Sequence, residues 1–224
     1  MKRFAFICTR DKNLKPITKD LLTYLDSIGT KVILLIGQES IFKAYEKALI
    51  KIEAEADDQI ILCHDDIKIT SSPEWFNSCL NSKLINKLTG FVGVAGTKKM
   101  STTGIWWDRA DWTAGNLSGY VLHGEDHTSC YGTSFGTYAQ VEVLDGLFLA
   151  ATYDTLCTVG LKKPDYFEGD WDFYDVLYTY KAHKLGFRNY TVPITLMHNS
   201  PGELQGRDSW HKNREAFIEK YLTT

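Results

Sequence analysis

Two adjacent acids, Asp65 and Asp66, follow His64 at the end of the apolar run of residues 60–63 and are the clearest candidates for chemistry in this sequence. Carboxylate oxygen is the ligand that hard cations such as Mg²⁺ or Mn²⁺ prefer, and such cations usually bridge a protein to the phosphates of its substrate. Asp is also common in solvated turns. The position after a buried strand favours a site, because open α/β sheets bind ligands at the carboxyl ends of their strands.

Asp172 and Asp175 lie three residues apart, where the sequence predicts the start of a helix. As N-cap and N3 residues they would only stabilise that helix. Alternatively, one of them removes a proton from an attacking hydroxyl. Glu168 and Asp170 lie in the same loop, and neighbouring carboxylates raise each other's pKa, as a general base requires. The sequence leaves this choice open.

His198 and the aromatic pair Trp106-Trp107 are two further candidates. A lone histidine is usually a packing or surface residue, but His198 follows a predicted strand, where its imidazole could contact a metal or a diphosphate. The two tryptophans could belong to the core. Their Gly-rich surroundings favour a binding role instead, because aromatic rings stack on sugars and bases.

These residues need a scaffold, and the first hundred residues predict one. Apolar runs at 4–8, 32–36 and 60–63 are typical of buried strands, and amphipathic helices starting at Thr18 and Ser40 separate them. Strand–helix alternation predicts an α/β fold with a mostly parallel central sheet covered by helices on both faces. The strands end in polar groups that should meet at one edge: Thr9 and Arg10, Gln38 and Glu39, and His64-Asp65-Asp66.

Further along, Ser72 caps another predicted helix, and residues 91–96 read as one strand. Residues 98–137 are rich in Gly, Ser, Thr and aromatics without clear periodicity, which predicts an irregular binding loop or lid. A strand at 141–151, a helix at 172–185, a strand near 190–193 and a polar C-terminal helix complete the expected order.

The composition excludes several classes of function. The net charge of −3 with scattered Lys and Arg lacks the basic stripe of a nucleic-acid binder. No stretch approaches the ~20 apolar residues of a membrane helix. Five dispersed cysteines indicate reduced thiols and a cytoplasmic location. The motifs of phosphate-binding loops, dinucleotide folds and serine hydrolases are not found in the sequence.

Six short strings, in order, resemble the GT-A fold and one branch of the family-2-like glycosyltransferases, found in bacteria and large viruses. They span residues 61–67, 92–96, 106–108, 143–148, 173–175 and 198–200, and the resemblance covers about residues 4–202. It implies a metal-dependent transferase that moves a sugar from a UDP- or GDP-sugar to a glycan or glycoconjugate acceptor with inversion. It also implies one GT-A domain over 1–224, with a nucleotide-binding half (1–97), an acceptor-binding half (98–224) and a lid at about 104–138.

The resemblance also implies roles for single residues. His64-Asp65-Asp66 occupies the place of the Asp-x-Asp motif, so Asp66 would be the main ligand of Mn²⁺ or Mg²⁺, and Asp65 would contact the ribose or assist the metal. His198 would complete the metal or diphosphate site. Asp145 would lie beneath the donor sugar or the acceptor, and Asp175 would be the base. The loops after the first two strands would hold the nucleoside through Thr9, Arg10, Gln38 and Glu39.

Two positions depart from the family pattern. His64 replaces the first acid of the motif, which would weaken metal binding or make His64 a ligand. Leu177 replaces the acid usually found two residues after the base, which leaves the base open between Asp175 and Asp172. Two alternatives remain: a sugar-phosphate nucleotidyltransferase, although residues 8–13 lack the glycine of its loop, and a non-catalytic nucleotide-sugar-binding module.

Overall fold

The computed structural model describes residues 1–125, 128–200 and 207–223. Its main sheet has seven strands in the described residues, in the order β2 (Lys31–Leu35), β1 (Arg3–Cys8), β3 (Gln59–Cys63), β11 (Phe148–Thr152), β5 (Thr89–Gly93), β12 (Arg188–Thr191) and β9 (Gln140–Val141). β1 is parallel to β2 and β3, and β12 is parallel to β5. Only β11 and β9 run antiparallel to their neighbours, so the predicted mostly parallel sheet is confirmed.

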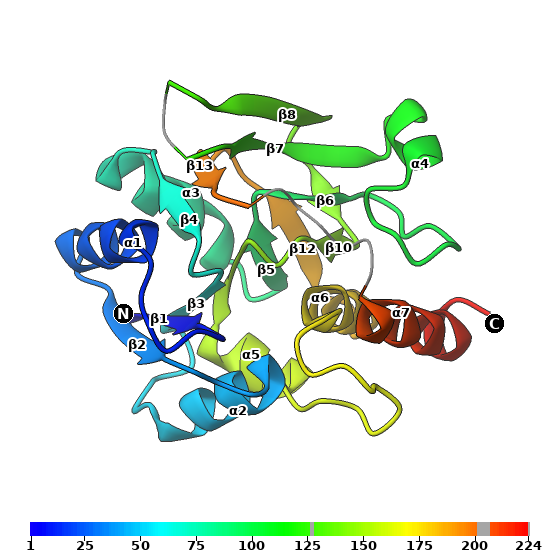
Figure 1. The fold of residues 1–224 in the computed structure, drawn as a ribbon, viewed down its shortest axis with the longest axis horizontal. Coiled ribbons are helices and arrows are strands. Elements are labelled where there is room, and N and C mark those ends of the chain that lie inside the picture. Colours follow the sequence, from blue (N-terminus) through cyan, green and yellow to red (C-terminus); the bar gives the residue numbers. More distant parts are fainter. Residues whose placement is uncertain (126–127, 201–206, 224) are drawn as a thin grey trace.

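Helices cover both faces of this sheet (Figure 1). α1 (Pro16–Ser27) and α3 (Pro73–Leu84) share one face, where the rings of Tyr24 and Phe76 meet at 5.8 Å. α2 (Ile41–Lys51), α5 (Tyr153–Val159) and α6 (Tyr174–Lys184) lie on the other, with Phe42 packed edge-on against Tyr178. The sequence had indicated the doubly covered sheet because its strands are continuous apolar runs.

Two helix starts follow the predicted caps, and one does not. Ser40 accepts a hydrogen bond from the Lys43 N–H, and Ser72 accepts one from the Trp75 N–H. α1 begins at Pro16 rather than after Thr18. Thr18 is buried, and its hydroxyl donates to the Asp65 carbonyl at 2.8 Å, so this residue ties α1 to the loop after β3.

A second sheet lies above the carboxyl ends of the first (Figure 1). Its order is β10 (Val143–Leu144), β6 (Ala95–Thr97), β7 (Leu117–His123), β13 (Leu196–His198) and β4 (Ile67–Ile69), and β8 (Tyr131–Gly136) pairs with β7. The predicted single strand at 91–96 is therefore wrong, because the chain leaves the main sheet at Val94 and enters the second sheet as β6. A Cβ at Gly96 would overlap the carbonyl oxygen of Val143, so glycine permits this close crossing.

The predicted irregular character of residues 98–137 is also wrong. The segment contains α4 (Arg109–Thr113) and the antiparallel β7–β8 pair, although residues 126 and 127 of the predicted lid lie outside the described residues. Likewise, the predicted strand at 141–151 is interrupted by a turn at Gly146 and Leu147 between β10 and β11. Glycines and aromatic residues hide the two-residue alternation that would have revealed these strands.

The helix predicted at 172–185 is α6, but the predicted capping role of Asp172 is wrong. The N-cap residue is Phe173, which has a left-handed φ of 70° and no side-chain cap. Asp172 and Asp175 therefore do not occupy the N-cap and N3 positions that the sequence suggested. The last helix, α7 (Asp208–Tyr221), lies beside α6 (Figure 1), with Phe217 packed against Tyr180. Among the described residues, no helix is both long and apolar enough to cross a bilayer.

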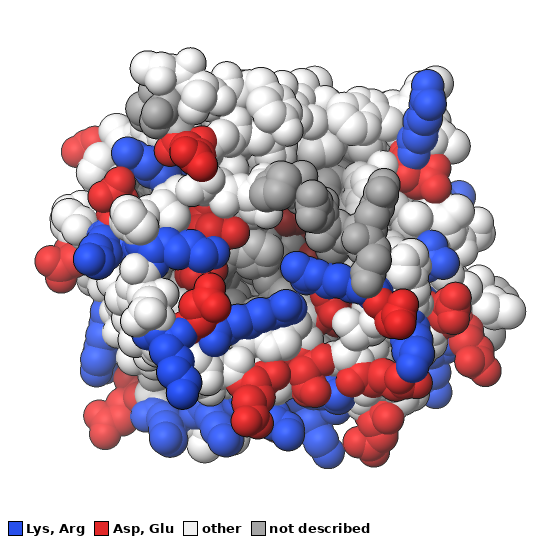
Figure 2. Space-filling view, in the orientation of Figure 1, with Lys and Arg blue, Asp and Glu red and all other residues white. Residues whose placement is uncertain are grey.

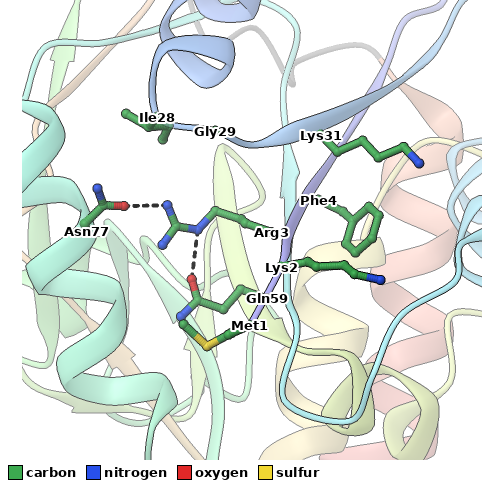
Figure 3. Close-up of a pocket in the computed structure, with 9 residues that line it drawn as sticks. All are labelled: Met1, Lys2, Arg3, Phe4, Ile28, Gly29, Lys31, Gln59 and Asn77. Atoms are coloured by element: carbon green, nitrogen blue, oxygen red, sulfur yellow. Dashed lines mark hydrogen bonds between the residues drawn. The ribbon is translucent and has the colours of Figure 1, made fainter.

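At the amino ends of β1, β2 and β3 lies a pocket of about 400 Å³ (Figure 3). Arg3 points across it and donates hydrogen bonds to Gln59, at 2.8 Å, and to Asn77 on α3. Gln59 in turn donates to Asn81 at 2.8 Å. These side chains satisfy one another and join α3 to the sheet.

Candidate active site

Three side chains that could bind a metal meet at the carboxyl end of β3. Asp66 Oδ1 lies 3.4 Å from His198 Nε2 and 3.8 Å from His64 Nδ1, and one ligand atom from each residue fits within 4.8 Å. Asp66 and His64 follow β3, whereas His198 ends β13, whose pairing with β4 brings it back over the β3 loop. The structure thus brings together the three predicted metal ligands from two segments that are far apart in the sequence.

The chemistry of this cluster fits a divalent cation. Asp66 Oδ1 is buried, and the 3.4 Å to His198 Nε2 and 3.8 Å to His64 Nδ1 are too long for strong hydrogen bonds. A cation between these groups would offset the desolvation of the carboxylate. Burial raises the pKa of Asp66, but the imidazoles of His198 and His64 and the charge of Lys15 outweigh it, so the net pKa is lowered. Burial, with His198 nearby, lowers the pKa of His64. One carboxylate and two imidazoles therefore face one another, and this donor set can hold a metal.

The turn between β10 and β11 brings Asp145 beside Asp175 in the first turn of α6. Asp175 Oδ2 accepts a hydrogen bond from the Gly146 N–H at 2.8 Å, and Asp145 Oδ1 accepts one from the Leu147 N–H. Burial first, and then the charge of Asp145, raises the pKa of Asp175 to about 7. A carboxylate with this pKa is suited to general-base chemistry near neutral pH.

A cleft of about 810 Å³ contains both groups. Its lining includes the metal cluster and the acid pair: His64, Asp66, His198, Asp145 and Asp175. The remaining wall is largely aromatic and comes from the segment before α4, from α4, from β8 and from α7: Trp106, Trp107, Trp112, Tyr131, Phe135 and Trp210. Figure 2 shows this face hollowed near its centre, with Lys and Arg side chains along the lower rim of the hollow and mostly uncharged surface above it.

Asp172 has different surroundings from Asp175. It is 5% exposed, accepts a hydrogen bond from Ser209 at 2.6 Å and pairs with Arg207 at 3.2 Å. The same residues line a small pocket of about 390 Å³ together with Arg10, whose guanidinium lies 4.6 Å from the ring centre of Trp171. Asp172 therefore joins α7 to the segment before α6 and lies at a cationic side of the cleft.

The other predicted nucleoside contacts lie where the loops after β1 and β2 meet. The Gln38 N–H donates to the Thr9 carbonyl at 2.9 Å, and the Trp171 indole donates to the Glu39 carbonyl at 2.8 Å. Burial raises the pKa of Asp65, while Lys15 opposes this rise. The 810 Å³ cleft is not lined by Thr9, Gln38, Glu39 or Asp65, and Gln38 instead lines a separate pocket between β2 and α2.

Comparison with known proteins supplies the decisive observation. A model of the "Glycosyltransferase like family" matches residues 17–221. The chain belongs to this family. Its cluster of His64, Asp66 and His198 thus lies in a glycosyltransferase framework, and the residue resemblance noted in the sequence is confirmed. A search of curated proteins gave no match.

Two solved structures share the fold. A197 from STIV superposes with a TM-score of 0.51 at 13% identity, over 86% of this chain and 82% of that one. GalNAc-T7, solved with UDP, GalNAc and Mn²⁺, gives a TM-score of 0.54 at 11% identity, over 99% of this chain but only 47% of its own length. This chain therefore spans about half of GalNAc-T7. At these identities the likeness shows the fold, which is GT-A.

Sequence reasoning did not assign several residues to this site. Tyr174 was part of a matching string but had no assigned role, and its hydroxyl lies 3.1 Å from His64 Nε2. His123 stacks on Tyr131 at 5.2 Å and lies 6.1 Å from His198. Arg207, Trp171 and Trp210 reach the cleft or its side pocket from segments without a motif. Their convergence depends on tertiary packing, and no spacing in the sequence signals it.

Proposed function

We propose that this glycosyltransferase transfers a sugar from a nucleotide-diphosphate sugar to an acceptor hydroxyl, with inversion, using a divalent cation held by Asp66, His198 and His64. The observation that carries the proposal is the buried Asp66 Oδ1, which faces the imidazoles of His198 and His64 at 3.4 and 3.8 Å, in the same cleft as a carboxyl group whose pKa is about 7. Bound there, the cation would neutralise the negative charge that develops on the leaving diphosphate.

Mn²⁺ is the cation we propose, ahead of Mg²⁺. Two imidazole nitrogens in the ligand set disfavour Mg²⁺, which prefers an all-oxygen octahedron. GalNAc-T7, which shares the fold, was solved with Mn²⁺ and UDP. Three protein ligands leave further coordination positions for diphosphate oxygens.

The donor's nucleotide part, UDP or GDP, is proposed to bind along the loops after β1, β2 and β3. Arg10 and Arg207 flank the small side pocket, and Lys15 lies near enough to lower the pKa of both Asp65 and Asp66. These cations suit a diphosphate. Thr9, Gln38, Glu39 and Asp65 would then contact the nucleoside, with Asp65 placed for the ribose.

Asp175 is proposed as the base. Its Oδ2 is held by the Gly146 N–H, so Oδ1 would take the proton from the acceptor hydroxyl. The acceptor oxygen then forms a bond to the anomeric carbon, and the carbon–oxygen bond to the diphosphate breaks with its electron pair leaving on the nucleotide. Burial, and then the charge of Asp145, raises the pKa of Asp175, and Asp145 would lie beneath the reacting sugar. Asp172 is the weaker candidate for the base, because Ser209 and Arg207 already engage both of its oxygens.

The acceptor is proposed to be a glycan or glycoconjugate that lies on the aromatic wall. Trp112 is 43% exposed and Tyr131 is 63% exposed, so both rings offer faces for stacking on a sugar. Residues 1–97 would thus form the nucleotide-binding half and 98–224 the acceptor-binding half, with 104–138 closing over the site. The dispersed cysteines support a cytoplasmic location.

Leu177, which replaces an acid of the family pattern, is the feature that supported the alternative of a non-catalytic binding module. In the structure Leu177 is fully buried on α6 and does not line the cleft. Because position 177 lies outside the cleft, a leucine there does not remove Asp145 or Asp175 from the site. This favours an enzyme over a binding module.

The test is nucleotide release from a panel of UDP- and GDP-sugars with and without Mn²⁺. Release that requires Mn²⁺ and is lost in Asp66→Asn, but kept in the control Asp20→Asn, supports the proposal; Asp20 lies exposed on α1, with 59% of its side chain accessible. Nucleotide binding without any sugar release would instead identify a binding module.

A further inference from the structure

The hydroxyl of Tyr174 lies between the metal cluster and the turn that holds the proposed base. It is 3.1 Å from His64 Nε2 and also 3.1 Å from the carbonyl oxygen of Gly146. The ring is 4% exposed and packs edge-on against Phe42 and Tyr45, at 6.4 Å and 5.9 Å. This packing fixes the position of the hydroxyl from the core side of α6.

The direction of these two hydrogen bonds follows from their chemistry. A carbonyl oxygen can only accept, and a phenol has a single proton. If Tyr174 donates to the Gly146 carbonyl, the proton between Tyr174 and His64 must come from His64 Nε2. In the opposite arrangement the buried Gly146 carbonyl would lose its donor, at a typical cost of about 1–3 kcal/mol. The favoured network therefore makes His64 the Nε2–H tautomer.

This tautomer has a consequence at the other ring nitrogen. A neutral imidazole with a proton on Nε2 carries its lone pair on Nδ1, and Nδ1 is the atom that lies 3.8 Å from Asp66 Oδ1. Metal-binding histidines usually donate their other N–H to a neighbouring group, which fixes the ring and its tautomer. Tyr174 occupies that place for His64.

Gly146 connects the same network to the proposed base. Its carbonyl accepts from Tyr174, and its N–H donates to Asp175 Oδ2 at 2.8 Å. A Cβ at position 146 would lie 2.5 Å from the Tyr174 hydroxyl oxygen and 3.0 Å from Asp175 Cβ. Any larger residue would have to displace the tyrosine, which explains why a glycine follows Asp145.

We propose that Tyr174 is a positioning residue that holds His64 as its Nε2–H tautomer, so that the Nδ1 lone pair faces Asp66 and a divalent cation. The proposal rests on the metal site of the proposed function. Its tautomer part can be tested in the metal-free protein, so the two can fail separately.

The direct test is the imidazole ¹⁵N–¹H correlation spectrum of metal-free, ¹⁵N-histidine-labelled protein at pH 8, above the ordinary imidazole pKa of about 6.5. The His64 signals are assigned from their loss in His64→Gln. The pattern of an Nε2–H tautomer is expected. An Nδ1–H pattern in the wild-type protein would overturn the proposal without any variant being needed.

The second test compares Tyr174→Phe with Tyr178→Phe. Tyr178 is a matched control, because it lies one turn later on α6, is fully buried and donates its hydroxyl to the Leu161 carbonyl at 2.6 Å. Mn²⁺ affinity is measured by electron paramagnetic resonance, and the melting temperature is measured without metal. Tyr174→Phe should weaken Mn²⁺ binding roughly 10- to 100-fold and remove the single-tautomer pattern, whereas Tyr178→Phe should lower only the melting temperature.

Equal Mn²⁺ affinity in Tyr174→Phe and wild type, or an equal loss in both tyrosine variants, would overturn the positioning role. If Tyr174→Phe does not fold, Gly146→Ala provides the alternative perturbation, and it should likewise weaken Mn²⁺ binding. A wild-type protein that shows the Nε2–H pattern but binds no Mn²⁺ would contradict the proposed metal function and the cation in this proposal, while the tautomer assignment would stand.

Discussion

The two ends of the main sheet carry polar clusters of opposite character. At the amino ends of the strands, Arg3, Gln59 and Asn77 lie in a pocket and satisfy one another with hydrogen bonds (Figure 3). At the carboxyl ends, Asp66 Oδ1 and Trp106 Nε1 are buried without a hydrogen-bond partner among the described residues, although both side chains line the large cleft.

The difference teaches where this fold can bind a ligand. The Arg3 network at the amino ends holds α3 to the sheet and satisfies its own polar groups, although the nearby Thr30 hydroxyl is buried without a hydrogen-bond partner among the described residues. Unmet donors and acceptors at the carboxyl ends have a desolvation cost that only a ligand or solvent can offset. Changes at the carboxyl end should therefore affect chemistry, and changes at the amino end should affect stability.

The largest effect is expected for Asp66→Asn, which keeps the shape of the side chain but removes the charge between the two imidazoles. Donor turnover should fall roughly 1,000-fold, the rate equivalent of about 4 kcal/mol of lost charge stabilisation. Initial rates of nucleotide release with saturating Mn²⁺ measure this. Wild-type turnover in the variant would place the catalytic metal elsewhere.

Asp175→Asn should come next, with kcat lowered roughly 100-fold because the base is removed, and with Mn²⁺ and nucleotide binding retained. The wild-type rate should also fall as the pH drops below about 7, because Asp175 becomes protonated. A pH–rate profile checks both points, and its acidic limb should be missing in the variant. An unchanged kcat would instead favour Asp172 as the base.

The same group predicts a pH effect on stability. The pKa of Asp175 is higher in the folded protein, at about 7, than the ~3.9 of an unfolded chain. A raised pKa means that stability is lost as the pH rises through the folded value. Asp175→Asn should therefore melt at a higher temperature than wild type at pH 8, and this advantage should shrink towards pH 4. A constant difference across this range would contradict the raised pKa.

Arg3→Met tests the amino-end cluster. It would leave the carbonyl oxygens of Gln59 and Asn77 without their donor and should lower the free energy of unfolding by about 1–3 kcal/mol. Denaturant titration measures this loss, and Mn²⁺ binding should stay at the wild-type value. A change in Mn²⁺ affinity would show that the two ends are not independent.

Trp106→Phe should have the smallest effect on stability. It removes a buried N–H that has no partner among the described residues, so the gain from losing an unsatisfied donor offsets part of the lost packing. The free energy of unfolding should change by about 1 kcal/mol or less. A loss of more than about 3 kcal/mol would show that this N–H is satisfied in the folded protein.

The sequence predicted the elements that have local signals and missed those that depend on tertiary pairing. Continuous apolar runs located β1, β2 and β3, and capping serines located α2 and α3. Short strands such as β4 and β13 have only three residues each, too few for a periodic pattern, yet their pairing carries His198 to Asp66.

The site shows the same limit. Asp66, His64 and His198 were recognisable because each lies at a strand end, and the structure brings them together. Tyr174 was not recognisable, because a buried aromatic on a helix looks like core until its hydroxyl is placed beside His64. Asp172 looked like a helix cap, but the left-handed Phe173 shifts the start of α6 beyond it.

The most direct test of the account is an anomalous difference map from crystals grown with Mn²⁺ and UDP or GDP. The account predicts one strong Mn²⁺ peak in contact with Asp66 Oδ1, His198 Nε2 and His64 Nδ1, with diphosphate oxygens completing its coordination. A nucleotide bound in the cleft with no Mn²⁺ peak at Asp66, or with the ion held by other residues, would contradict it.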